Sequence, residues 1–368
     1  MAIQVCRSRL PGAKKELHFF NNSGKIISKI IRKMEELKMN NFIPPFSISN
    51  RMLELVSEIS EKVGRINSHK DLESKPQLRK NNRIRSIHSS LKIEANSLSL
   101  NEVRDVINGR TVIGDRKEIQ EVKNAYRAYE MIEKIDPLSI DDLKKVHGIM
   151  TQCTVDESGV FRTGAEGVFS GDKCIFVCPP PDMINELMTN LFSWMKRCEG
   201  KVHPLIMSAV FHYEFVFIHP FSDGNGRMAR LWHTLILYKW RSIFEFIPLE
   251  SRIEKYQQKY YEAIAACHKN GSSDVFIEFM LGLIDQELDE VIRQVSREGA
   301  GSSQYVKRML EKMEYDVPYT SNEIMALLGL KSKETLRRNY LNPAIEEGLI
   351  QMTVPDKPNS KNQRYVKK

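Results

Sequence analysis

The sequence has no run of eighteen apolar residues, and its first twenty residues contain no apolar stretch of the kind found in secretory signals. A membrane-spanning helix needs about 20 consecutive apolar residues. A signal peptide needs an apolar segment after a basic start. We therefore expect no membrane-spanning helix, no membrane partner and a cytoplasmic location.

Cysteine pairs with the spacing of a zinc or redox site are also missing. The six cysteines are scattered, and the two nearest, Cys174 and Cys178, stand four positions apart. Zinc and redox pairs usually have two residues between the cysteines. We expect reduced thiols that pack as small apolar groups.

The sequence also lacks GxxxxGK[ST], the phosphate-binding loop of many nucleotide-binding proteins. A nucleotide site in this chain must therefore be built in another way. The formal net charge of +8 allows acidic partners such as nucleotides or nucleic acid. It does not require them, because a basic surface also serves solubility.

Helical periodicity is what the sequence has in abundance. Apolar residues recur at helical spacing along most of the chain, as in NRMLELVSEISEKVGRI over residues 50–66. Residues 160–181 break this pattern: apolar and polar residues alternate, glycines are frequent and three prolines follow. This favours a β-hairpin followed by a turn.

The length predicts two or three domains. Residues 68–82 are polar and indicate a connector, and SREGAGSS over residues 296–303 indicates a linker. We predict a mainly α protein in three parts. These are an N-terminal helical region over residues 1–80, a helical core over 81–296 and a small C-terminal domain over 303–368.

The C-terminal domain shows the element order of a winged helix. A helix over 303–313 is followed by a helix over 319–330 that opens with a Thr320–Glu323 capping box. A helical stretch over 332–350 and two short strands over 350–366 complete the order.

Residues 303–368 contain 12 Lys and Arg against 8 Asp and Glu. Four of the basic residues, Lys331, Lys333, Arg337 and Arg338, cluster on the second helix of the turn motif, where a recognition helix would meet DNA. Lys357, Lys361 and Arg364 of the wing would contact phosphates. Winged helices also bind proteins, so the sequence leaves both kinds of partner open.

The dodecamer HPFSDGNGRMAR, residues 219–230, has a composition that a packed core does not need. It connects an apolar helix over 203–217 to another over 227–240. Gly224, Asn225 and Gly226 therefore lie where backbone N–H groups at a helix start are unpaired and attract anions. Arg227 and Arg230 lie three apart, on nearly one helix face, and guanidinium groups match phosphate oxygens.

Asp223 and His219 add chemistry to this turn. A carboxylate beside a polyanion is repulsive unless a cation lies between them, so Asp223 suggests Mg²⁺. His219 is the one group here that takes up a proton near neutral pH. Asp223 as an N-cap remains an alternative. A zinc site is another, although no third ligand lies close in sequence. The residues predict a site for a nucleotide phosphate chain, Mg²⁺ and a general base.

The dodecamer resembles the HxFx[D/E]GNGRxxR signature of Fic-domain proteins, with all fixed positions met. The resemblance covers roughly residues 80–290. It implies a helical core with a β-hairpin flap and transfer of AMP from ATP to a protein hydroxyl, which is AMPylation. The kinase branch of the family carries a lysine in the anion-binding turn. This chain has Gly226 there, which favours nucleotidyl transfer.

The resemblance assigns a role to each residue of the motif. It makes His219 the base that deprotonates a Ser, Thr or Tyr hydroxyl of the target, and Asp223 the Mg²⁺ ligand. The remaining roles concern the phosphates of ATP: Gly224, Asn225 and Gly226 hold them, Arg227 binds a phosphate downstream of the attacked one, and Arg230 binds the γ-phosphate.

Two further segments resemble substrate-binding parts of the family. The hairpin over residues 160–178 corresponds to the flap, whose exposed edge pairs with an extended target segment. Its backbone borders the nucleotide, for which the candidates are Val168, Phe169, Ser170 and Gly171. YQQKYYEAIAACH, residues 256–268, resembles the segment that lines the adenine pocket and offers Tyr260, Tyr261 and His268.

The segment SSLKIEAN, residues 89–96, resembles the family's inhibitory motif [S/T]xxxE[G/N]. Ser90 and Glu94 fit this motif, and Ala95 stands where Gly or Asn is usual. The resemblance places an inhibitory helix near residues 86–96. It implies that Glu94 pairs with Arg230, so that ATP binds in an unproductive pose.

Several alternatives remain at the level of sequence. The transferred group is AMP by resemblance, but another nucleotide group such as UMP is open. A DNA-binding regulator that senses nucleotide through its core is the alternative from another class. Another protein and the chain itself are both open as the target, and a homodimer is open as well, since family members often dimerise.

Overall fold

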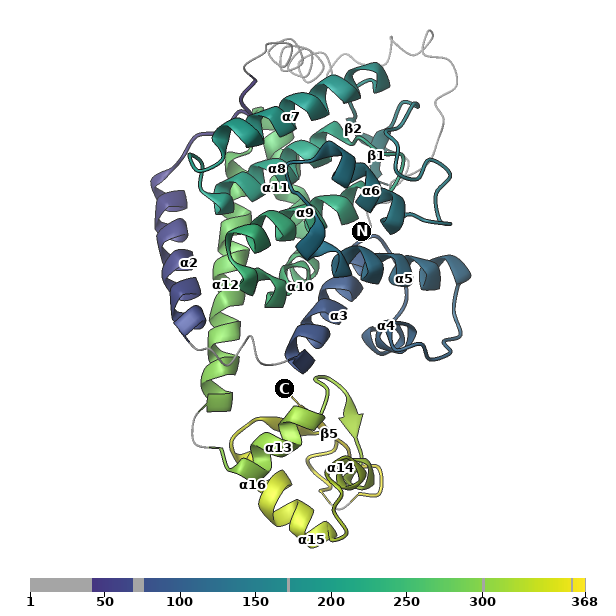
Figure 1. Ribbon diagram of the computed structural model, residues 1–368, viewed down its shortest axis with the longest axis vertical. Coiled ribbons are helices and arrows are strands. Elements are labelled where there is room, and N and C mark those ends of the chain that lie inside the picture. The colour runs from purple at the N-terminus through teal and green to yellow at the C-terminus, as the bar shows by residue number, and fades with distance from the viewer. Residues whose placement is uncertain (1–41, 69–75, 171–172, 300–301, 359, 368) are drawn as a thin grey trace. The chain divides into compact units, whose positions relative to one another are not determined.

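Helices make up most of the molecule, as the periodicity predicts. The computed structural model describes residues 42–68, 76–170, 173–299, 302–358 and 360–367. Its contacts divide the chain into two units, one that includes residues 84–285 and one that includes residues 286–368. The division falls inside helices, so the domain boundaries drawn from the sequence stay predictions. Figure 1 shows the elements of each unit.

Two buried helices form the centre of the larger unit. Helix α8 spans Pro204–Ile218 and begins with a proline. Proline has no backbone N–H, and in the first turn of a helix that group would have no intrahelical partner anyway. Nearly all of its residues are buried. After a short turn the chain enters α9, Asn225–Trp240, which packs on α8. The predicted apolar helices over 203–217 and 227–240 are confirmed, and the second begins at Asn225.

Further helices surround this pair in the larger unit (Figure 1). They are α5 Arg116–Glu130, α6 Ile140–Met150, α7 Ile184–Cys198, α10 Leu249–Lys255 and α11 Gln257–Asn270. Three 3-10 helices, Ile132–Lys134, Pro181–Met183 and Ser242–Phe246, connect some of them. The arrangement leaves the turn between α8 and α9 in contact with several elements, as described below.

The predicted hairpin is present, and its strands occupy only part of the residues that predicted it. Strand β1, Gly167–Ser170, pairs antiparallel with β2, Lys173–Val177, and Val168 lies opposite Phe176. The register shifts between Val168 and Phe169. A local irregularity of this kind bends a hairpin.

The helices before the core differ from the sequence prediction in one respect. Helix α2 spans Asn50–Ser68, α3 spans Pro76–Ile93 and α4 spans Leu100–Ile107. The polar connector expected over 68–82 is wrong for residues 76–82, which are helical. Asn81 and Asn82 are buried there, so polarity in this stretch does not mean exposure. Residues 1–41 of the predicted N-terminal helical region lie outside the described residues.

The predicted capping box is confirmed: Thr320 caps α14 together with Glu323. Ser99 caps α4 in the same way together with Glu102. The linker expected over 296–303 is shorter than predicted, because α12 runs from Asp274 to Gly299.

The C-terminal residues form helices and a small sheet with a core of their own. The elements are α13 Gln304–Lys312, β3 Pro318–Tyr319, α14 Ser321–Leu328, α15 Lys333–Leu336, a π-helical turn Arg337–Leu341, α16 Asn342–Glu346, β4 Ile350–Met352 and β5 Tyr365–Lys367. The antiparallel sheet has the order β3-β5-β4. Apolar residues from both helices and strands, such as Met309, Ile324 and Tyr340, pack into one cluster. The predicted order of helices followed by a hairpin is confirmed.

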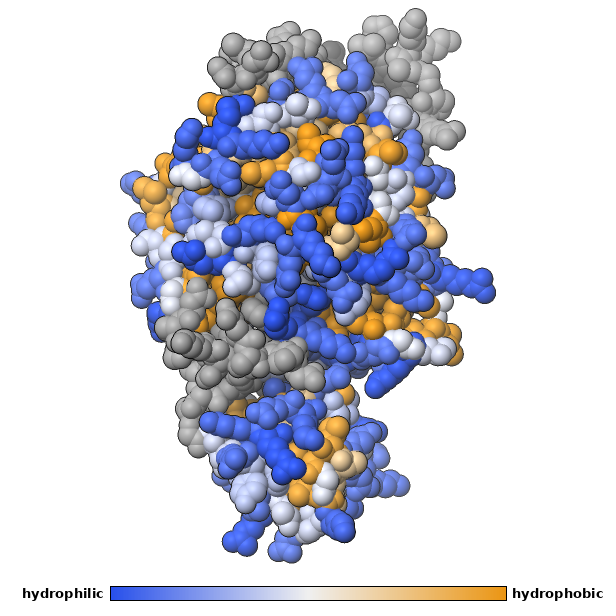
Figure 2. All heavy atoms as spheres, in the orientation of Figure 1, coloured by the Kyte–Doolittle hydropathy of each residue, from blue (hydrophilic) through white to orange (hydrophobic). Residues whose placement is uncertain are grey.

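Hydrophilic residues cover much of the visible surface, with hydrophobic residues between them (Figure 2). Among the described residues, no helix combines the length and apolar character needed to span a bilayer.

Candidate active site

The turn between α8 and α9 begins with His219 in an unusual backbone conformation. Its φ is 52° and its ψ is 59°, the left-handed region that non-glycine residues seldom adopt. The His219 N–H donates to the Phe215 carbonyl at 2.9 Å and so ends α8. Such a conformation persists only where its surroundings fix it.

Arg162 holds much of this conformation in place, and no motif in the sequence points to it. Its Nε donates to the His219 carbonyl at 2.7 Å, and its Nη2 donates to the Pro179 carbonyl at 2.6 Å. Its own backbone N–H donates to the Pro220 carbonyl at 2.9 Å. The side chain is buried. Arg162 therefore joins the turn that begins at His219 to the residues that follow the hairpin.

The surroundings of His219 keep its imidazole neutral. Its pKa is lowered to about 4, chiefly by burial and also by the nearby Arg162 guanidinium, while the Val216 carbonyl, Glu94 and Asp223 act in the opposite direction. Its Nδ1 lies 3.4 Å from the Val216 carbonyl. A neutral imidazole at neutral pH is the form that accepts a proton.

Backbone geometry makes the following turn suitable for an anion. Gly224 has a φ of 81° and occupies the N-cap of α9 without a side-chain capping bond. The alternative of Asp223 as the N-cap is therefore wrong. Its Oδ1 instead accepts from the Gly224 N–H at 2.6 Å. The helix start thus keeps the unpaired backbone donors that attract phosphate.

The Asn225 side chain is committed to the turn itself. Its Oδ1 accepts from the Phe221 N–H at 3.0 Å, and its Nδ2 donates to the Phe221 carbonyl at 2.7 Å. These two bonds close the loop around residues 221–225. The predicted phosphate contact of Asn225 is thereby left to its backbone.

His147 on α6 braces the same turn and was also missed in the sequence. Its Nδ1 accepts from the Gly159 N–H at 2.9 Å, so the proton lies on Nε2, which donates to the Asp223 carbonyl at 2.9 Å. The ring stacks on Phe221 with centroids 3.6 Å apart. Burial lowers the pKa of His147 to about 4, which keeps this neutral tautomer.

Arg227 is buried but only loosely paired. Its Nη2 lies 3.4 Å from Asp223 Oδ1, and its Nη1 lies 3.5 Å from Glu121 Oε1. Within the described part of the chain, its Nε and Nη1 have no hydrogen-bond partner. Buried donors of this kind are costly unless something satisfies them. A phosphate oxygen at the turn has the charge and geometry to do so.

Arg230 is held tightly by the predicted inhibitory segment, residues 89–96. Its Nε donates to Ser90 Oγ at 3.0 Å, and its Nη2 donates to the Ser90 carbonyl and to Glu94 Oε1, both at 2.9 Å. A methyl group on Gly226 would come within 2.2 Å of Glu94 Oε1. Glycine at 226 therefore leaves the space that the Glu94 carboxylate occupies.

The two tyrosines proposed for the base pocket lie close to this ion pair. The Tyr260 hydroxyl is 2.9 Å from His212 Nε2, and the Tyr261 hydroxyl accepts from Gln257 Nε2 at 3.2 Å. Burial raises the pKa of both phenols, while the Arg230 guanidinium lowers both. His268 stacks on Phe176 of β2 with centroids 4.1 Å apart, which brings this helix against the hairpin.

The hairpin residues proposed to border the nucleotide are only partly described. Val168, Phe169 and Ser170 belong to β1, and Gly171 lies outside the described residues. On the opposite strand, Val177 keeps 51% of its surface exposed. The predicted roles of these residues, like those of the motif, stay predictions.

Asp223 can serve a magnesium ion, although no metal site is complete without a substrate. No group of three or more His, Cys, Asp or Glu side chains placed to hold a metal occurs in the residues that the structure describes. Mg²⁺ at nucleotide sites is usually held by one or two carboxylates together with substrate phosphates and water. The partly exposed Asp223 carboxylate beside the anion turn fits that donor set.

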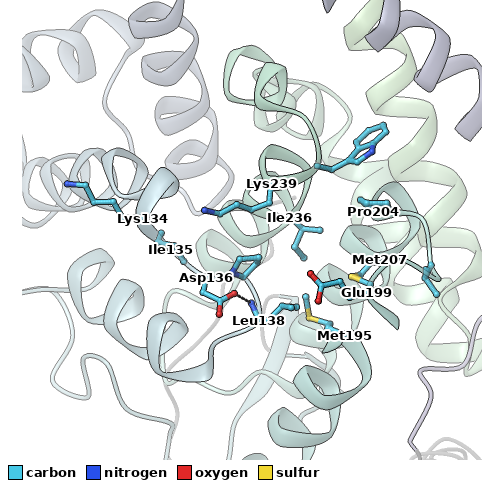
Figure 3. A pocket seen from close by; sticks show the side chains of 14 residues that line it. Lys134, Ile135, Asp136, Leu138, Met195, Glu199, Pro204, Met207, Ile236 and Lys239 are labelled. Carbon is cyan, nitrogen blue, oxygen red and sulfur yellow. Dashed lines mark hydrogen bonds between the residues drawn. The ribbon is translucent and has the colours of Figure 1, made fainter. Parts of the chain in front are cut away.

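A cavity of about 510 Å³ lies elsewhere in the larger unit. Its lining includes Pro204 at the start of α8 and Ile236, Lys239 and Trp240 at the end of α9 (Figure 3). The dodecamer lies at the other ends of these two helices. The cavity contains none of the predicted site residues, so we do not assign it to the nucleotide.

Comparison with known sequences finds two family matches. A sequence model of the Fic/DOC family matches residues 137–237. A model of the C-terminal domain of filamentation-induced-by-cAMP protein Fic-like matches residues 304–366. The first match contains the dodecamer, and the second coincides with the C-terminal core.

Individual relatives agree with these matches. A protein adenylyltransferase Fic from Aedes aegypti is 28% identical over 216 residues, which are 56% of this chain and 41% of that protein. The chain thus spans less than half the length of this curated relative.

Solved structures extend the similarity over most of the chain. A Fic family protein from Desulfovibrio desulfuricans is 39% identical, with a TM-score of 0.67, and the alignment covers 89% of this chain and 98% of that one. A Fic-1 fragment from Caenorhabditis elegans is 22% identical with a TM-score of 0.55, covering 67% and 73%. The second likeness concerns the fold alone.

Proposed function

This chain belongs to the Fic family, and from that premise we propose that it transfers AMP from ATP to a hydroxyl side chain of a protein. The observation that carries the proposal is the turn between α8 and α9. There a neutral, buried His219 precedes an uncapped helix start. Arg227, on the first turn of that helix, keeps buried donors that lack a hydrogen-bond partner among the described residues. A base beside a phosphate site is the minimum that nucleotidyl transfer requires.

In this reaction a Ser, Thr or Tyr hydroxyl of the target attacks the α-phosphorus of ATP. The oxygen–phosphorus bond to the target forms, the bond to the bridging α–β oxygen breaks, and pyrophosphate leaves with that electron pair. His219 takes the hydroxyl proton. The backbone of Gly224–Gly226 and the guanidinium groups of Arg227 and Arg230 hold the phosphates.

Magnesium fits the same proposal through Asp223, which would hold it against the phosphates. When bound, the ion supplies positive charge that neutralises the oxygens of the leaving group. Arg162 and His147 have a positioning role. They donate to the backbone carbonyls of His219 and Asp223, and so hold the turn in one conformation.

Autoinhibition by Glu94 is part of the proposal. The 2.9 Å pair between Glu94 and Arg230 occupies the guanidinium proposed for the γ-phosphate. A triphosphate in a productive pose would have to displace the carboxylate. The contact therefore sets a threshold for transfer, and the chain is expected to be slow until the pair is broken.

The first test uses ATP labelled at the α-phosphate and a His219→Ala variant. The wild type, or Glu94→Gly if basal transfer is slow, should place label on a protein hydroxyl, its own or a target's. His219→Ala should lower the rate by about 10²–10⁴ while it still binds MgATP, because a positioned base contributes that much. His203→Ala, at the far end of α8, is the control.

Label placement separates the competing chemistries. Label from the α-position but not from the γ-position identifies nucleotidyl transfer, and α-labelled UTP supplied in parallel tests UMP. Transfer by His219→Ala at the wild-type rate would remove this residue from its proposed role. Nucleotide binding with no transfer by any variant would favour a nucleotide sensor instead.

For the C-terminal residues we propose DNA binding through a winged helix. Lys333, Arg337 and Arg338 are exposed on the helical stretch that begins with α15, and Lys331 is exposed just before it, outside the helix where the sequence predicted it. Lys357, Lys361 and Arg364 are exposed between β4 and β5. Exposed basic side chains at the recognition helix and at the wing are what duplex binding needs.

Binding to duplex DNA should weaken steeply with salt, because Lys and Arg release counterions from the phosphates. Gel shifts between about 50 and 200 mM salt would measure this. A chain that ends near residue 301 should lose the shift and keep AMP transfer. Retained DNA binding by that folded truncated chain, or a shift that does not depend on salt, would favour a protein partner for this domain.

A further inference from the structure

Glu121 on α5 contacts both halves of the proposed active site, although it lies in neither motif. Its Oε1 lies 3.5 Å from Arg227 Nη1, and its Oε2 accepts from Asn96 Nδ2 at 3.1 Å. Asn96 is the last residue of the inhibitory segment and is buried. One carboxylate thus bridges a proposed phosphate ligand and the segment that carries Glu94.

The charges around the anion-binding turn give the Glu121 carboxylate an effect on nucleotide binding. Glu94, Glu121 and Asp223 approach the two guanidinium groups of Arg227 and Arg230, so carboxylates outnumber guanidiniums by one. The Glu121 side chain is only 14% exposed and Arg227 only 3%, so water screens their interaction weakly. A triphosphate that enters this turn meets repulsion from Glu121 as well as from Glu94.

The two arginines are held in different ways. Arg230 has close bonds to Ser90 and Glu94, whereas Arg227 has long ion pairs and buried donors. A phosphate can therefore satisfy Arg227 before Arg230 is released. Once it does so, Glu121 loses its cation and keeps Asn96 as its neighbour.

We propose that Glu121 is a second carboxylate of the inhibitory device. It competes with the phosphates of the nucleotide for Arg227. Through Asn96 it also holds the inhibitory segment where Glu94 reaches Arg230. Binding at Arg227 and release of the segment are then linked, and by thermodynamic reciprocity each favours the other. This inference rests on the proposed nucleotide site.

Glu118 offers a matched control on the same helix. It lies one turn before Glu121 and accepts from the Ser97 N–H at 2.9 Å and from Ser97 Oγ at 2.7 Å. It therefore tethers the chain just beyond the inhibitory segment in a similar way. Unlike Glu121, it forms no ion pair with Arg227 among the described salt bridges. Glu118→Gln removes a charge that holds this part of the chain, and it leaves the ion pair between Glu121 and Arg227 in place.

The test measures the Kd of the full chain for MgATP by titration calorimetry. Glu121→Gln removes the charge beside Arg227 and weakens the bond from Asn96, whose acceptor becomes a neutral amide oxygen. It should bind MgATP about threefold to tenfold more tightly than the wild type, the range for loss of one partly buried ion pair. Glu118→Gln should stay within about twofold of the wild type.

Both changes are repeated in a Glu94→Gly chain. There Glu121→Gln should still tighten binding, but by a smaller factor, because the part of its effect that acts through Glu94 is gone. Equal factors in the two backgrounds would show that Glu121 acts on Arg227 alone, and would overturn the coupling to the segment.

Two other results would also contradict the proposal. One is a Glu121→Gln chain with an unchanged Kd for MgATP and a lower Tm, as expected of a purely structural residue. The other is a Glu118→Gln chain that binds MgATP as tightly as Glu121→Gln does. Labelled AMP transfer is recorded in parallel. Absence of transfer with the expected Kd changes would refute the proposed reaction while leaving the role of Glu121 intact.

Discussion

At the scale of the single residue, Ala95 has a strained backbone and is the neighbour of Glu94, which pairs with Arg230. Its φ is 67°, in the left-handed region. The Asn96 N–H donates to the Leu91 carbonyl at 3.1 Å, and the Ala95 N–H donates to the Lys92 carbonyl at 3.0 Å. These two bonds form a Schellman motif at the end of α3, in which glycine is the usual residue at this position.

Ala95→Gly should therefore stabilise the protein. Relief of the left-handed conformation is worth about 1–2 kcal/mol, and the greater freedom of glycine in the unfolded chain offsets part of it. We expect a net gain of about 0.5–1 kcal/mol in the free energy of unfolding, together with slower basal AMP transfer, because Glu94 is held more firmly.

Urea unfolding of Ala95→Gly and of a control measures this effect. Ala265→Gly, at an exposed position in the interior of α11, should lose about 0.5–1 kcal/mol, since glycine is unfavourable there. A loss of stability in both variants would show that Ala95 is not strained.

The sequence could predict that the motif residues share one site, because they lie close together along the chain. His219, Asp223 and the two arginines lie within twelve positions, so their spacing carries information. Arg162, His147 and Glu121 could not be found in the same way. Arg162 and His147 act on backbone carbonyls from distant parts of the chain, and such bonds leave no pattern in the sequence.

At the scale of the element, the inhibitory segment is held by several modest contacts rather than one strong one. On the side of α10 and α11 these are Ser89 Oγ to Ser251 Oγ at 3.0 Å, Lys92 Nζ to Glu254 at 2.8 Å and Gln257 Nε2 to the Ile93 carbonyl at 3.2 Å. Partly exposed contacts of this kind contribute little each. In the pair between Glu94 and Arg230, the guanidinium is fully buried and also bonds to Ser90, whereas the Glu94 side chain keeps 32% of its surface exposed.

Glu94→Gly should therefore accelerate AMP transfer. Removing a competing charge-assisted bond of about 1.5–3 kcal/mol corresponds to about ten- to a hundredfold more productive ATP binding. Arg230→Ala should not be activated, because it loses the γ-phosphate contact together with the inhibition. The double variant should behave like Arg230→Ala, since the two residues act as one unit. Radiolabelled self-modification compares the four chains, and a Glu94→Gly rate equal to wild type would make residues 89–96 an ordinary helix end.

Prediction of helices from the sequence succeeded where the apolar periodicity was strong, and it failed where the buried residues are polar. Helices α8 and α9 follow directly from their apolar residues, and the capping box of Thr320 and Glu323 follows from local hydrogen bonds. Residues 76–82 show the limit. Their polar side chains suggested a connector, but a helix forms there with Asn81 and Asn82 buried. Tertiary packing overrides local composition in such a stretch.

At the scale of the whole molecule, the larger unit buries an unusual set of neutral histidines. Burial lowers the pKa of His147 and His219 to about 4 and of His233 to about 3, and lowers that of His212 well below its ordinary value. His212 and His233 pack with ring centroids 5.5 Å apart between α8 and α9. Each must stay uncharged for the folded state to persist.

The consequence is a stability that depends on pH in a definite window. Unfolded histidines have a pKa of about 6.5, above the folded values, so the unfolded chain binds more protons as the pH falls below that value. The stabilisation is fully present above about pH 6.5 and is lost as the pH falls toward about 4. At about pH 5 the loss from four such groups amounts to several kcal/mol, which is a large part of a typical total stability of about 5–15 kcal/mol. We expect Tm to stay level from pH 8 to 7 and to fall steadily below 6.5.

A His233→Gln variant tests the cause, because glutamine has a similar polar shape and does not titrate. It should flatten the decline of Tm between about pH 6.5 and 5 by removing one of the protons that drive unfolding. His203→Gln is the comparison, since His203 is only half-buried at the start of α8 and should change the slope less. Carboxylates contribute mainly below about pH 4.5, so the window above it isolates the histidines. A Tm that does not change between pH 7 and 5, or a slope that His233→Gln leaves unaltered, would show that the imidazoles are not kept neutral by the fold.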